Sequence, residues 1–206
     1  MRRKVITLRF LSTQEAIEFL EYITRIYSKE MIGGEIKGTT VRLFLKASFS
    51  SDEAFISRIK EAIGHWKSSR RPNVTGEYRH NIRMILSQAS LEVGIPVRAI
   101  IDVLKLKGFK ARLEGGHIVT NADHNTLVSI ISEFSSRYAE ALRIIATPML
   151  KRLVAVIATV QALNVEDALN NLYSRGVASL KDNRWTLTVN YDSALKILEM
   201  NPSAER

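Results

Sequence analysis

An internal repeat in the second half of the chain is the feature that most restricts its fold. Residues 104–109, LKLKGF, align with residues 172–177, LYSRGV, so that Gly108 matches Gly176 at an offset of 68 residues. The same offset, without gaps, pairs further apolar positions: Ile95 with Leu163, Val97 with Val165, Ile101 with Leu169, Val119 with Leu187 and Leu127 with Leu195. Each copy is predicted as helix, turn, helix ending at glycine, short hairpin and helix, which is the order of a winged helix-turn-helix or of any small three-helix unit with a hairpin.

The first 80 residues follow a different pattern. Residues 4–10 alternate polar and apolar side chains, which predicts a strand. Ser12 with Glu15, and Ser50 with Glu53, are capping boxes that predict the starts of two helices. A hairpin is predicted between the helices, with its turn at a glycine. This order predicts a β-α-β-β-α layer with an antiparallel sheet and helices on one face.

The predicted fold class is therefore α+β, an N-terminal layer followed by two winged-helix-like helical repeats with short hairpins. Residues 67–80, KSSRRPNVTGEYRH, have the composition of a loop or linker. We predict three domains: residues 1–80 as the nucleic-acid-binding layer, 81–145 as the first repeat and 146–206 as the second.

Basic residues outnumber acidic ones by 30 to 21, which gives a formal charge of +9 at pH 7. Residues 1–80 hold 15 basic and 9 acidic side chains, against 15 and 12 in residues 81–206. This excess indicates polyanionic partners; nucleic acid is the first candidate and an anionic membrane surface the second. We expect the basic binding surface in the N-terminal part, which holds most of the excess charge. The alternative is a charge that only maintains solubility.

No enzyme signature is present in the sequence. Without cysteine there is no thiolate nucleophile and no cysteine-ligated metal. Phosphate-binding, dinucleotide-binding and nucleophile-elbow motifs are missing too. The four histidines, at positions 65, 80, 117 and 124, lack metal-ligand spacing. His117 and His124 flank the exit of the predicted hairpin and are expected at surface or turn positions. Asp123 and Asp192 follow the hairpins and are predicted to be helix N-caps. We expect no catalysis, metal or cofactor.

Targeting and membrane segments are not expected. Residues 1–4, MRRK, are basic, but no uncharged apolar run follows them. The most apolar segment, residues 144–163, contains Pro148, Lys151 and Arg152 and does not fit a spanning helix. We expect a cytoplasmic protein without membrane contact. Absent cysteine, few glutamines and many isoleucines and charged residues are typical of a thermophile.

The N-terminal hairpin carries the first candidate binding surface. In residues 41–46, VRLFLK, the valine and leucines face one way, and the arginine, phenylalanine and lysine face the other. The predicted bare side of the sheet bears an aromatic ring among cations: Arg9, Lys37, Arg42, Phe44 and Lys46. Bases can stack on such a ring while phosphates pair with the cations, which suits single-stranded nucleic acid. The alternative is that this side packs on another domain or subunit, with Phe44 in a core.

A second candidate cluster lies in the predicted linker. It interleaves basic and aromatic residues: Trp66, Lys67, Arg70, Arg71, Tyr78 and Arg79. Such a segment can wrap a strand and become ordered on binding. The alternative is a solvated linker with Trp66 buried at the end of its helix.

The second helix of each repeat makes a poor recognition helix for duplex DNA. Residues 97–107 are mostly apolar, with Arg98 and Asp102, and residues 165–175 begin with the acids Glu166 and Asp167. Packing or oligomerisation is the expected role of both.

Three blocks of the sequence resemble a known family. They are KVITLRFLSTQEAIEFL (residues 4–20), LKLKGFKARLEGGHIVTNAD (104–123) and ATPMLKRLVAVIA (146–158). They are similar to archaeal proteins related to ThermoDBP, a single-stranded DNA-binding protein of some thermophilic archaea. The resemblance runs from about residue 3 to residue 198 and rests on block order, not on a catalytic motif.

The resemblance implies that the N-terminal domain binds nucleic acid and that the C-terminal part builds a homo-oligomer, a dimer or a tetramer, around the strand. It assigns no individual binding residue. The chain ends soon after Met200 without a long leucine-rich heptad tail, so a zipper dimer is not expected.

The leading hypothesis is sequence-tolerant binding of single-stranded DNA by a basic homo-oligomer, with RNA as an open alternative. A duplex-DNA regulator built on the winged-helix-like repeats is one rival. The other is a protein-interaction scaffold that binds no nucleic acid.

Overall fold

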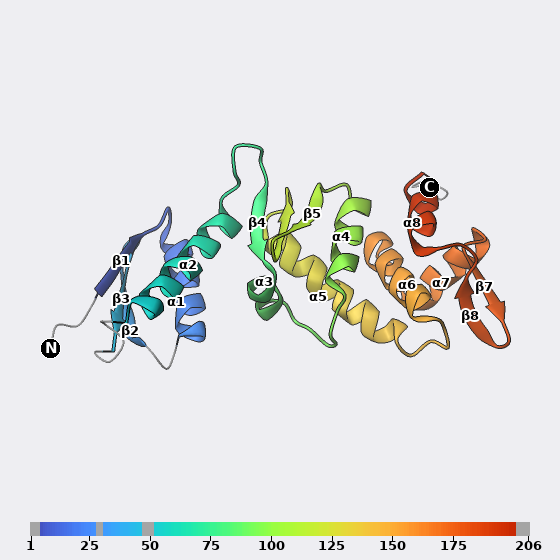
Figure 1. Cartoon of the computed structure of the whole chain (residues 1–206), viewed down its shortest axis with the longest axis horizontal. Coiled ribbons are helices and arrows are strands. Elements are labelled where there is room, and N and C mark those ends of the chain that lie inside the picture. The colour runs from blue at the N-terminus through green and yellow to red at the C-terminus, as the bar shows by residue number, and fades with distance from the viewer. Residues whose placement is uncertain (1–4, 28–30, 47–51, 201–206) are drawn as a thin grey trace. The chain divides into compact units, whose positions relative to one another are not determined.

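The computed structural model describes residues 5–27, 31–46 and 52–200. The chain divides into two compact units, Met1–Lys67 and Ser68–Arg206. The boundary falls in the last turn of helix α2 (Glu53–Arg70), whereas the sequence predicts it near residue 80. Figure 1 shows the elements of both units, and the predicted α+β class is confirmed.

The first unit is a three-stranded antiparallel sheet with two helices. Its strands are β1 (Val5–Arg9), β2 (Met31–Lys37) and β3 (Thr40–Leu45), and their order in the sheet is β1-β3-β2. Helix α1 (Thr13–Ile26) packs on β2 and β3, and α1 and α2 lie together beside one face of the sheet (Figure 1). The predicted β-α-β-β-α order is confirmed.

Burial alternates along the central strand β3 as the sequence predicts. Val41, Leu43 and Leu45 are fully buried, whereas Arg42 is exposed and Phe44 is half-buried. Because successive side chains of a strand point to opposite faces, one face of the sheet belongs to the core and the other is left open. This arrangement leaves Arg42 and Phe44 outside the core of the unit.

The two helices of this unit begin with side-chain caps. The Glu15 N–H donates to Ser12 Oγ at 3.0 Å, which confirms the first predicted cap. Ser50 lies outside the described residues. Asp52 caps α2, because its Oδ1 accepts the Phe55 N–H at 3.0 Å, and Glu53 is the first helical residue.

Helix α1 approaches β2 closely at one glycine. A Cβ on Gly34 would collide with the side chain of Leu20, and Gly34 faces Leu43 across the ladder, on the core side. Gly33, its neighbour on the opposite face, would meet nothing within 4 Å. The two adjacent glycines therefore differ: a side chain at position 34 would require Leu20 to move, whereas position 33 has open space around it.

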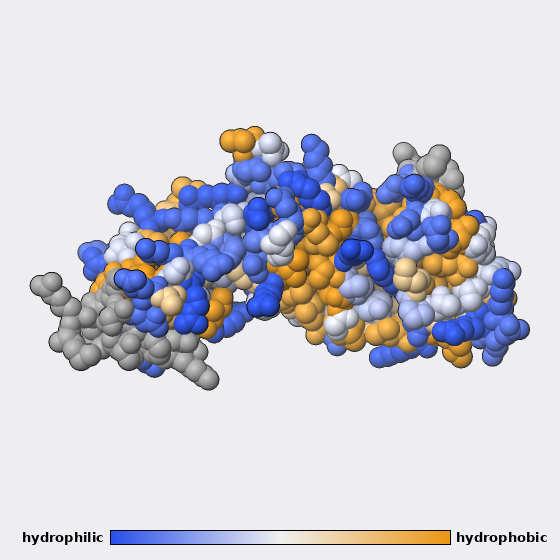
Figure 2. All heavy atoms as spheres, in the orientation of Figure 1, coloured by the Kyte–Doolittle hydropathy of each residue, from blue (hydrophilic) through white to orange (hydrophobic). Residues whose placement is uncertain are grey.

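The second unit contains the two repeats. The first copy comprises β4 (Tyr78–Asn81), α3 (Ile82–Gln88), α4 (Val97–Leu106), β5 (Ala111–Glu114), β6 (His117–Thr120) and α5 (His124–Ala141). The second comprises α6 (Pro148–Gln161), α7 (Val165–Ser174), β7 (Ala178–Lys181), β8 (Arg184–Leu187) and α8 (Tyr191–Met200). Strands β4, β6 and β5 form one sheet in that order, and β7 and β8 form a separate hairpin whose tip is strongly hydrophilic (Figure 2).

The predicted repeat is visible in the hydrogen bonds after α4 and α7. Gly108 and Gly176 have φ angles of 86° and 69°, a left-handed conformation that favours glycine at a helix end. Their N–H groups donate to the carbonyls of Lys105 and Tyr173, at 2.9 Å in both copies. The helix termini of the two copies are therefore built alike.

The hairpins depart from the predicted offset by one residue, because the second copy is shorter by one position after its glycine. Val119, the third residue of β6, corresponds to Thr186, the third residue of β8, and not to Leu187 as predicted. Both turns have two central residues of positive φ, Gly115-Gly116 and Asp182-Asn183, as a two-residue type I′ turn requires.

One hydrophobic core joins the two copies. It includes buried residues from Ile85 to Leu198, and helix α6 is buried along most of its length between α4, α5 and α7. The predicted boundary at residues 145/146 therefore does not separate two cores. Strand β4, which the sequence assigns to the N-terminal domain, pairs with β6 in this second unit.

Candidate nucleic-acid interface

The uncovered face of the first sheet is built from three cross-strand rows. The register aligns Val5, Phe44 and Gly33; Thr7, Arg42 and Glu35; and Arg9, Thr40 and Lys37. Residues opposite one another in a ladder point to the same side, so the three rows share one surface. Lys46 follows Phe44 by two residues and therefore lies on the same side. We call this surface the open face. Four of the residues proposed from the alternation, together with Lys46, are thus brought together on one side of the sheet.

Phe44 lies in the middle of the open face, on the central strand. Its neighbours across the ladder are Val5 on one side and Gly33 on the other. Gly33 has no side chain, and the space where a Cβ would point is empty to 4 Å. One flank of the ring is therefore left clear for a flat ligand to lie over it.

Two cations, Arg42 and Lys46, lie next to this ring along the chain; Arg9 and Lys37 lie farther along the face, in the row of Thr40, and one acid lies among the four. Arg9, Lys37, Arg42 and Lys46 are all exposed. Glu35 lies directly opposite Arg42 and is exposed, yet neither side chain forms a hydrogen bond or ion pair with any described residue. The open face is therefore cationic.

Sequence reasoning did not place Gly33 and Glu35 on this surface, although a signal was present. Both precede Lys37 by even numbers of residues, and the period-two rule puts all three on one side of a strand.

Trp66 does not belong to a binding surface, which corrects its predicted stacking role. Only 2% of the residue is exposed. Its ring packs against Tyr22 at a centroid distance of 4.9 Å and edge-on to Phe19 at 5.7 Å. This cluster also buries the hydroxyl of Tyr22, whose pKa is raised by desolvation. The alternative stated from the sequence, a buried Trp66 in its helix, is what the structure shows.

The two ends of the predicted linker belong to a helix and a strand, and a turn joins them. Helix α2 continues through Arg70, and β4 begins at Tyr78. The turn between them is held by Asn73, whose Oδ1 accepts the N–H groups of Thr75 and Glu77, each at 2.9 Å. This segment is therefore shaped before any ligand arrives.

The three cations of this segment differ in exposure. Lys67 and Arg71 are exposed. Arg70 is half-buried, and one of its terminal nitrogens lies 3.5 Å from Asn125 Oδ1. Lys67 and Arg71 remain candidates for phosphate contact, whereas Arg70 is committed to the second unit.

Tyr78 and Arg79 point to opposite faces of the second sheet. Tyr78 is half-buried and stacks on His80 at a ring distance of 6.0 Å, so its ring has limited access to a base. Arg79 lies on the outer face, 3.6 Å from Glu114. These two residues therefore do not form one binding surface.

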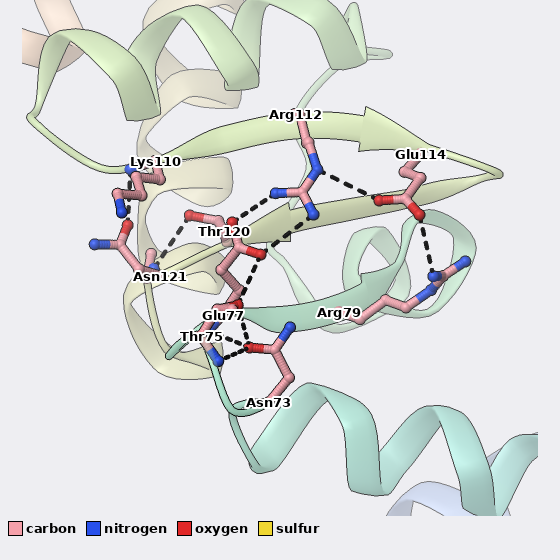
Figure 3. Close-up of polar contacts among 10 residues, drawn as sticks. Asn73, Thr75, Glu77, Arg79, Lys110, Arg112, Glu114, Thr120 and Asn121 are labelled. Carbon is pink, nitrogen blue, oxygen red and sulfur yellow. Dashed lines mark hydrogen bonds and ion pairs between the residues drawn. The ribbon is translucent and has the colours of Figure 1, made fainter.

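Arg79 is part of an ion-pair network across this outer face, drawn in Figure 3. Arg112 binds Glu77 through both terminal nitrogens, with Nη2 3.2 Å from Oε2, and its Nε lies 3.4 Å from Glu114. The hydrogen bonds from Arg112 lower the pKa of Glu77, and the same bonds raise the pKa of Arg112. A phosphate would have to compete with these carboxylates, so Arg79 is a weaker candidate than the cations of the open face.

Three of the histidines are buried, which for His117 and His124 corrects the predicted surface or turn positions. His80, His117 and His124 are at most 9% exposed. His80 Nε2 lies 3.4 Å from the Ala122 carbonyl, and His124 Nε2 lies 2.6 Å from Gln88 Oε1. Burial is the largest cause that lowers the pKa of His80 to about 4 and of His124 to about 3. Both rings are thus neutral core residues near pH 7.

The helix that would read duplex DNA in the first copy is enclosed by the protein. Helix α4 buries five of its residues, and Asp102 binds Tyr191 and Arg152 of the second copy at 2.9 and 3.4 Å. A helix covered in this way cannot enter a major groove. The expectation that packing is its role is supported.

Among the described residues, no group of three or more His, Asp or Glu side chains could hold a metal ion. Asp123 caps α5 as predicted, with Oδ1 accepting the Thr126 N–H at 2.9 Å. Asp192 does not cap α8; Asn190 does, accepting the Ser193 N–H at 2.8 Å.

The family model described as an uncharacterized protein conserved in archaea, DUF2067, matches residues 8–196. The chain belongs to this family. The match to DUF2067 spans parts of both compact units. Comparison with curated proteins and with solved structures gave no match. In the described part of this DUF2067 chain, no single helix is long and apolar enough to cross a membrane. Helices α6 and α7 reach that length and composition only when taken together, and the chain bends by 105° between them.

Proposed function

We propose that this protein binds single-stranded nucleic acid through the open face, without catalysis and with little sequence preference. The observation that carries the proposal is the position of Phe44, a half-buried aromatic ring on the central strand, beside Gly33 and among exposed cations. Stacking on an aromatic ring tolerates any base, and phosphates are held by charge alone.

The geometry of the sheet suits a strand that crosses it. Arg42 and Lys46 lie two residues on either side of Phe44 along β3, at a spacing of about 7 Å, since a strand advances ~3.4 Å per residue. Lys37 and Arg9 lie on the two flanking strands. A base stacked on Phe44 would thus have cations on each side for the neighbouring phosphates.

The cations and the aromatic ring of the open face bind phosphates and bases, not the sugar, so DNA and RNA are both part of the proposal. The other residues suggested from the sequence support it less. Trp66 is buried, Tyr78 is half-buried and Arg79 is paired with Glu114. Lys67 and Arg71 are retained as additional phosphate contacts.

Self-association into a dimer or a tetramer, and kinship with the ThermoDBP-related proteins, are part of the same proposal. They rest on the resemblance of the sequence blocks. Light scattering with size-exclusion chromatography measures the assembly; a monomer at all concentrations would remove this part while leaving binding by the open face testable.

The deciding experiment measures binding of labelled oligo-dT, oligo-U and duplex DNA by fluorescence anisotropy over a range of salt. Each phosphate neutralised on a single strand adds about 0.7 to the slope of log affinity against log salt. Replacing Arg42 and Lys46 by Gln should therefore lower the slope by roughly 1.4 and weaken both single strands. The same charge change at Arg25 and Lys60, exposed residues of α1 and α2, is the matched control.

Three results would contradict the proposal. The first is undetectable or salt-independent binding, which favours a protein scaffold. The second is a preference for duplex over single strand, which favours a duplex regulator. The third is an equal loss of affinity in the control variant, which would show that only total charge matters.

A further inference from the structure

The tip of the β7–β8 hairpin presents two cations side by side. Lys181 and Arg184 flank the two-residue turn and are directly opposite each other in the ladder. Both are exposed, and neither forms a hydrogen bond or ion pair with any residue in the described part of the chain. Like charges directly opposite on a hairpin destabilise it slightly, so this pair does not serve the stability of the hairpin.

The corresponding hairpin of the first copy has the reverse arrangement. Its turn is flanked by Glu114 and His117, which are paired across β5 and β6. Glu114 lies 3.6 Å from Arg79 and 3.4 Å from Arg112, so these two cations of the first-copy sheet are paired with a carboxylate. The two copies share a backbone design, yet only the second keeps an unoccupied cation pair at its tip.

The opposite face of the β7–β8 hairpin anchors it to the second unit. Trp185 pairs with Leu180 and packs edge-on against Tyr173 at 5.4 Å. The Trp185 N–H donates to the Ile145 carbonyl at 3.0 Å, and the Trp185 carbonyl accepts the Thr147 N–H at 2.9 Å. The hairpin is therefore fixed on the second unit through Trp185, one row from the turn, and the turn itself is a hydrophilic end (Figure 2).

Hydroxyl groups continue the cationic face toward the base of the hairpin. Ser179 and Thr186 are opposite each other two rows from the tip, so the alternation of side chains places them on the same side as Lys181 and Arg184. Their hydroxyl oxygens are 3.5 Å apart. The Thr186 hydroxyl also donates to the Ser179 carbonyl at 3.5 Å, and both residues are half-buried. The two exposed cations, with these hydroxyls behind them, are side chains of the kinds that bind phosphodiester oxygens in nucleic-acid complexes.

We infer that the tip of the β7–β8 hairpin is a second contact site for the phosphate backbone of a nucleic-acid strand. Lys181 and Arg184 hold the phosphates, and the hydroxyls of Ser179 and Thr186 donate to their oxygens. The site lies in the second unit and uses none of the residues of the open face, so it goes beyond the proposed function. It predicts that a long strand contacts both units.

Lysine footprinting on the full-length wild-type protein tests this inference directly. Acetylation of each lysine is followed by mass spectrometry, with and without a long oligo-dT. Protection of Lys181 by several-fold is expected. Lys60 and Lys196, exposed on α2 and α8, serve as unprotected references.

The same data separate the two proposals, because Lys37 and Lys46 report on the open face. Protection of these two without Lys181 overturns the hairpin site and leaves the proposed function standing. Protection of Lys181 alone overturns the open face instead. Protection of Lys181 by polyglutamate but not by oligo-dT would assign the tip to an acidic protein partner and overturn the nucleic-acid assignment.

A charge-removal variant supplies an independent measurement. Replacing Lys181 and Arg184 by Gln should lower the salt slope for a long strand by roughly 1.4, two phosphates at about 0.7 each. Replacing Arg83 and Lys196, exposed residues of α3 and α8, removes the same charge and should leave the slope close to wild type. The hairpin variant relieves a repulsion, so loss of the fold is not expected, and an unchanged slope would overturn the inference.

Discussion

The hydroxyl of Tyr191 donates a 2.9 Å hydrogen bond to the carboxylate of Asp102, which joins helix α8 of the second copy to helix α4 of the first. Arg152 of α6 completes the contact, with Nη2 3.4 Å from the same carboxylate and its guanidinium 4.4 Å from the Tyr191 ring centre. Burial is the main cause that raises the pKa of Tyr191, and the Asp102 charge adds to it. The phenol is therefore a constant donor at this junction.

Replacing Tyr191 by Phe should destabilise the protein by about 1–3 kcal/mol, because a partly buried carboxylate loses a donor. Urea unfolding measures the loss. Tyr173→Phe is the matched control, since the Tyr173 side chain is 57% exposed and its hydroxyl has no partner among the described residues. Equal stability of the Tyr191 variant and the wild type would show that the junction depends on packing alone.

Replacing Phe44 by Leu should weaken single-strand binding by about 1–3 kcal/mol, the range for loss of one base stack. The folded state should keep its stability, because Phe44 is half-buried on the face away from the core. Affinities come from anisotropy and stability from thermal melting. Phe44→Tyr retains a ring and should retain the affinity; a Leu variant that binds as the wild type does would exclude stacking at this position.

Replacing Glu35 by Gln should strengthen binding of every single strand several-fold at low salt. The carboxylate lies opposite Arg42 on the open face and repels phosphates that approach it. The gain should shrink as salt screens the interaction. Glu61→Gln on the helix side is the control. Unchanged affinity of the Glu35 variant at low salt would place the strand elsewhere.

Replacing Gly34 by Ala should destabilise the first unit by about 1–3 kcal/mol, since the added methyl group meets Leu20 and overpacks the contact with α1. Gly33→Ala is the neighbouring control and should change stability much less, because its methyl group meets nothing within 4 Å. Chemical denaturation of both variants measures the difference. Equal losses of stability in the two variants would show that any side chain disturbs the backbone of β2, and that the contact with Leu20 is not the cause.

Stability should fall as the pH is lowered from 7 to 5, because His80 and His124 resist protonation in the folded state. Their pKa values are lowered to about 4 and about 3, whereas unfolded histidines titrate near 6.5. In this window the unfolded chain binds the additional protons, which costs about 2 kcal/mol of stability for each buried histidine.

Urea titrations at several pH values measure this loss, and His80→Gln should remove about half of it. A flat profile between pH 7 and 5 would mean that water reaches the two rings.

The sequence predicts the alternating strands well and the segment after α2 poorly, for physical reasons. The apolar positions 41, 43 and 45 have one way to face a core, so the bare side of β3 could be inferred. The serine, proline, asparagine and glycine residues of 67–80 suggested a loop throughout, but the two serines, at 68 and 69, do not stop a helix. Helix α2 ends at Arg70, just before the pair Arg71-Pro72, because the residue before proline disfavours helical backbone. Trp66 consequently lies inside the helix and turns toward Tyr22.

The repeat shows a similar limit. The glycines at 108 and 176 determine the helix ends, and these were predictable from the alignment. The one-residue difference between the copies could not be predicted. Both hairpin turns have two residues, and the shortening lies between the glycine and the hairpin, where the sequence has no periodic pattern. The caps show the same ambiguity: Asn190 and Asp192 are both good N-cap residues, and only the local backbone decides between them.

Helix α6 belongs by sequence to the second copy, yet much of the apolar surface of α4 and α5 rests on it. A polypeptide that stopped at residue 145 would leave those helices facing water, and one that started there would leave α6 uncovered. Neither half can be expected to fold when expressed separately, and thermal melting of the second unit should occur as one transition.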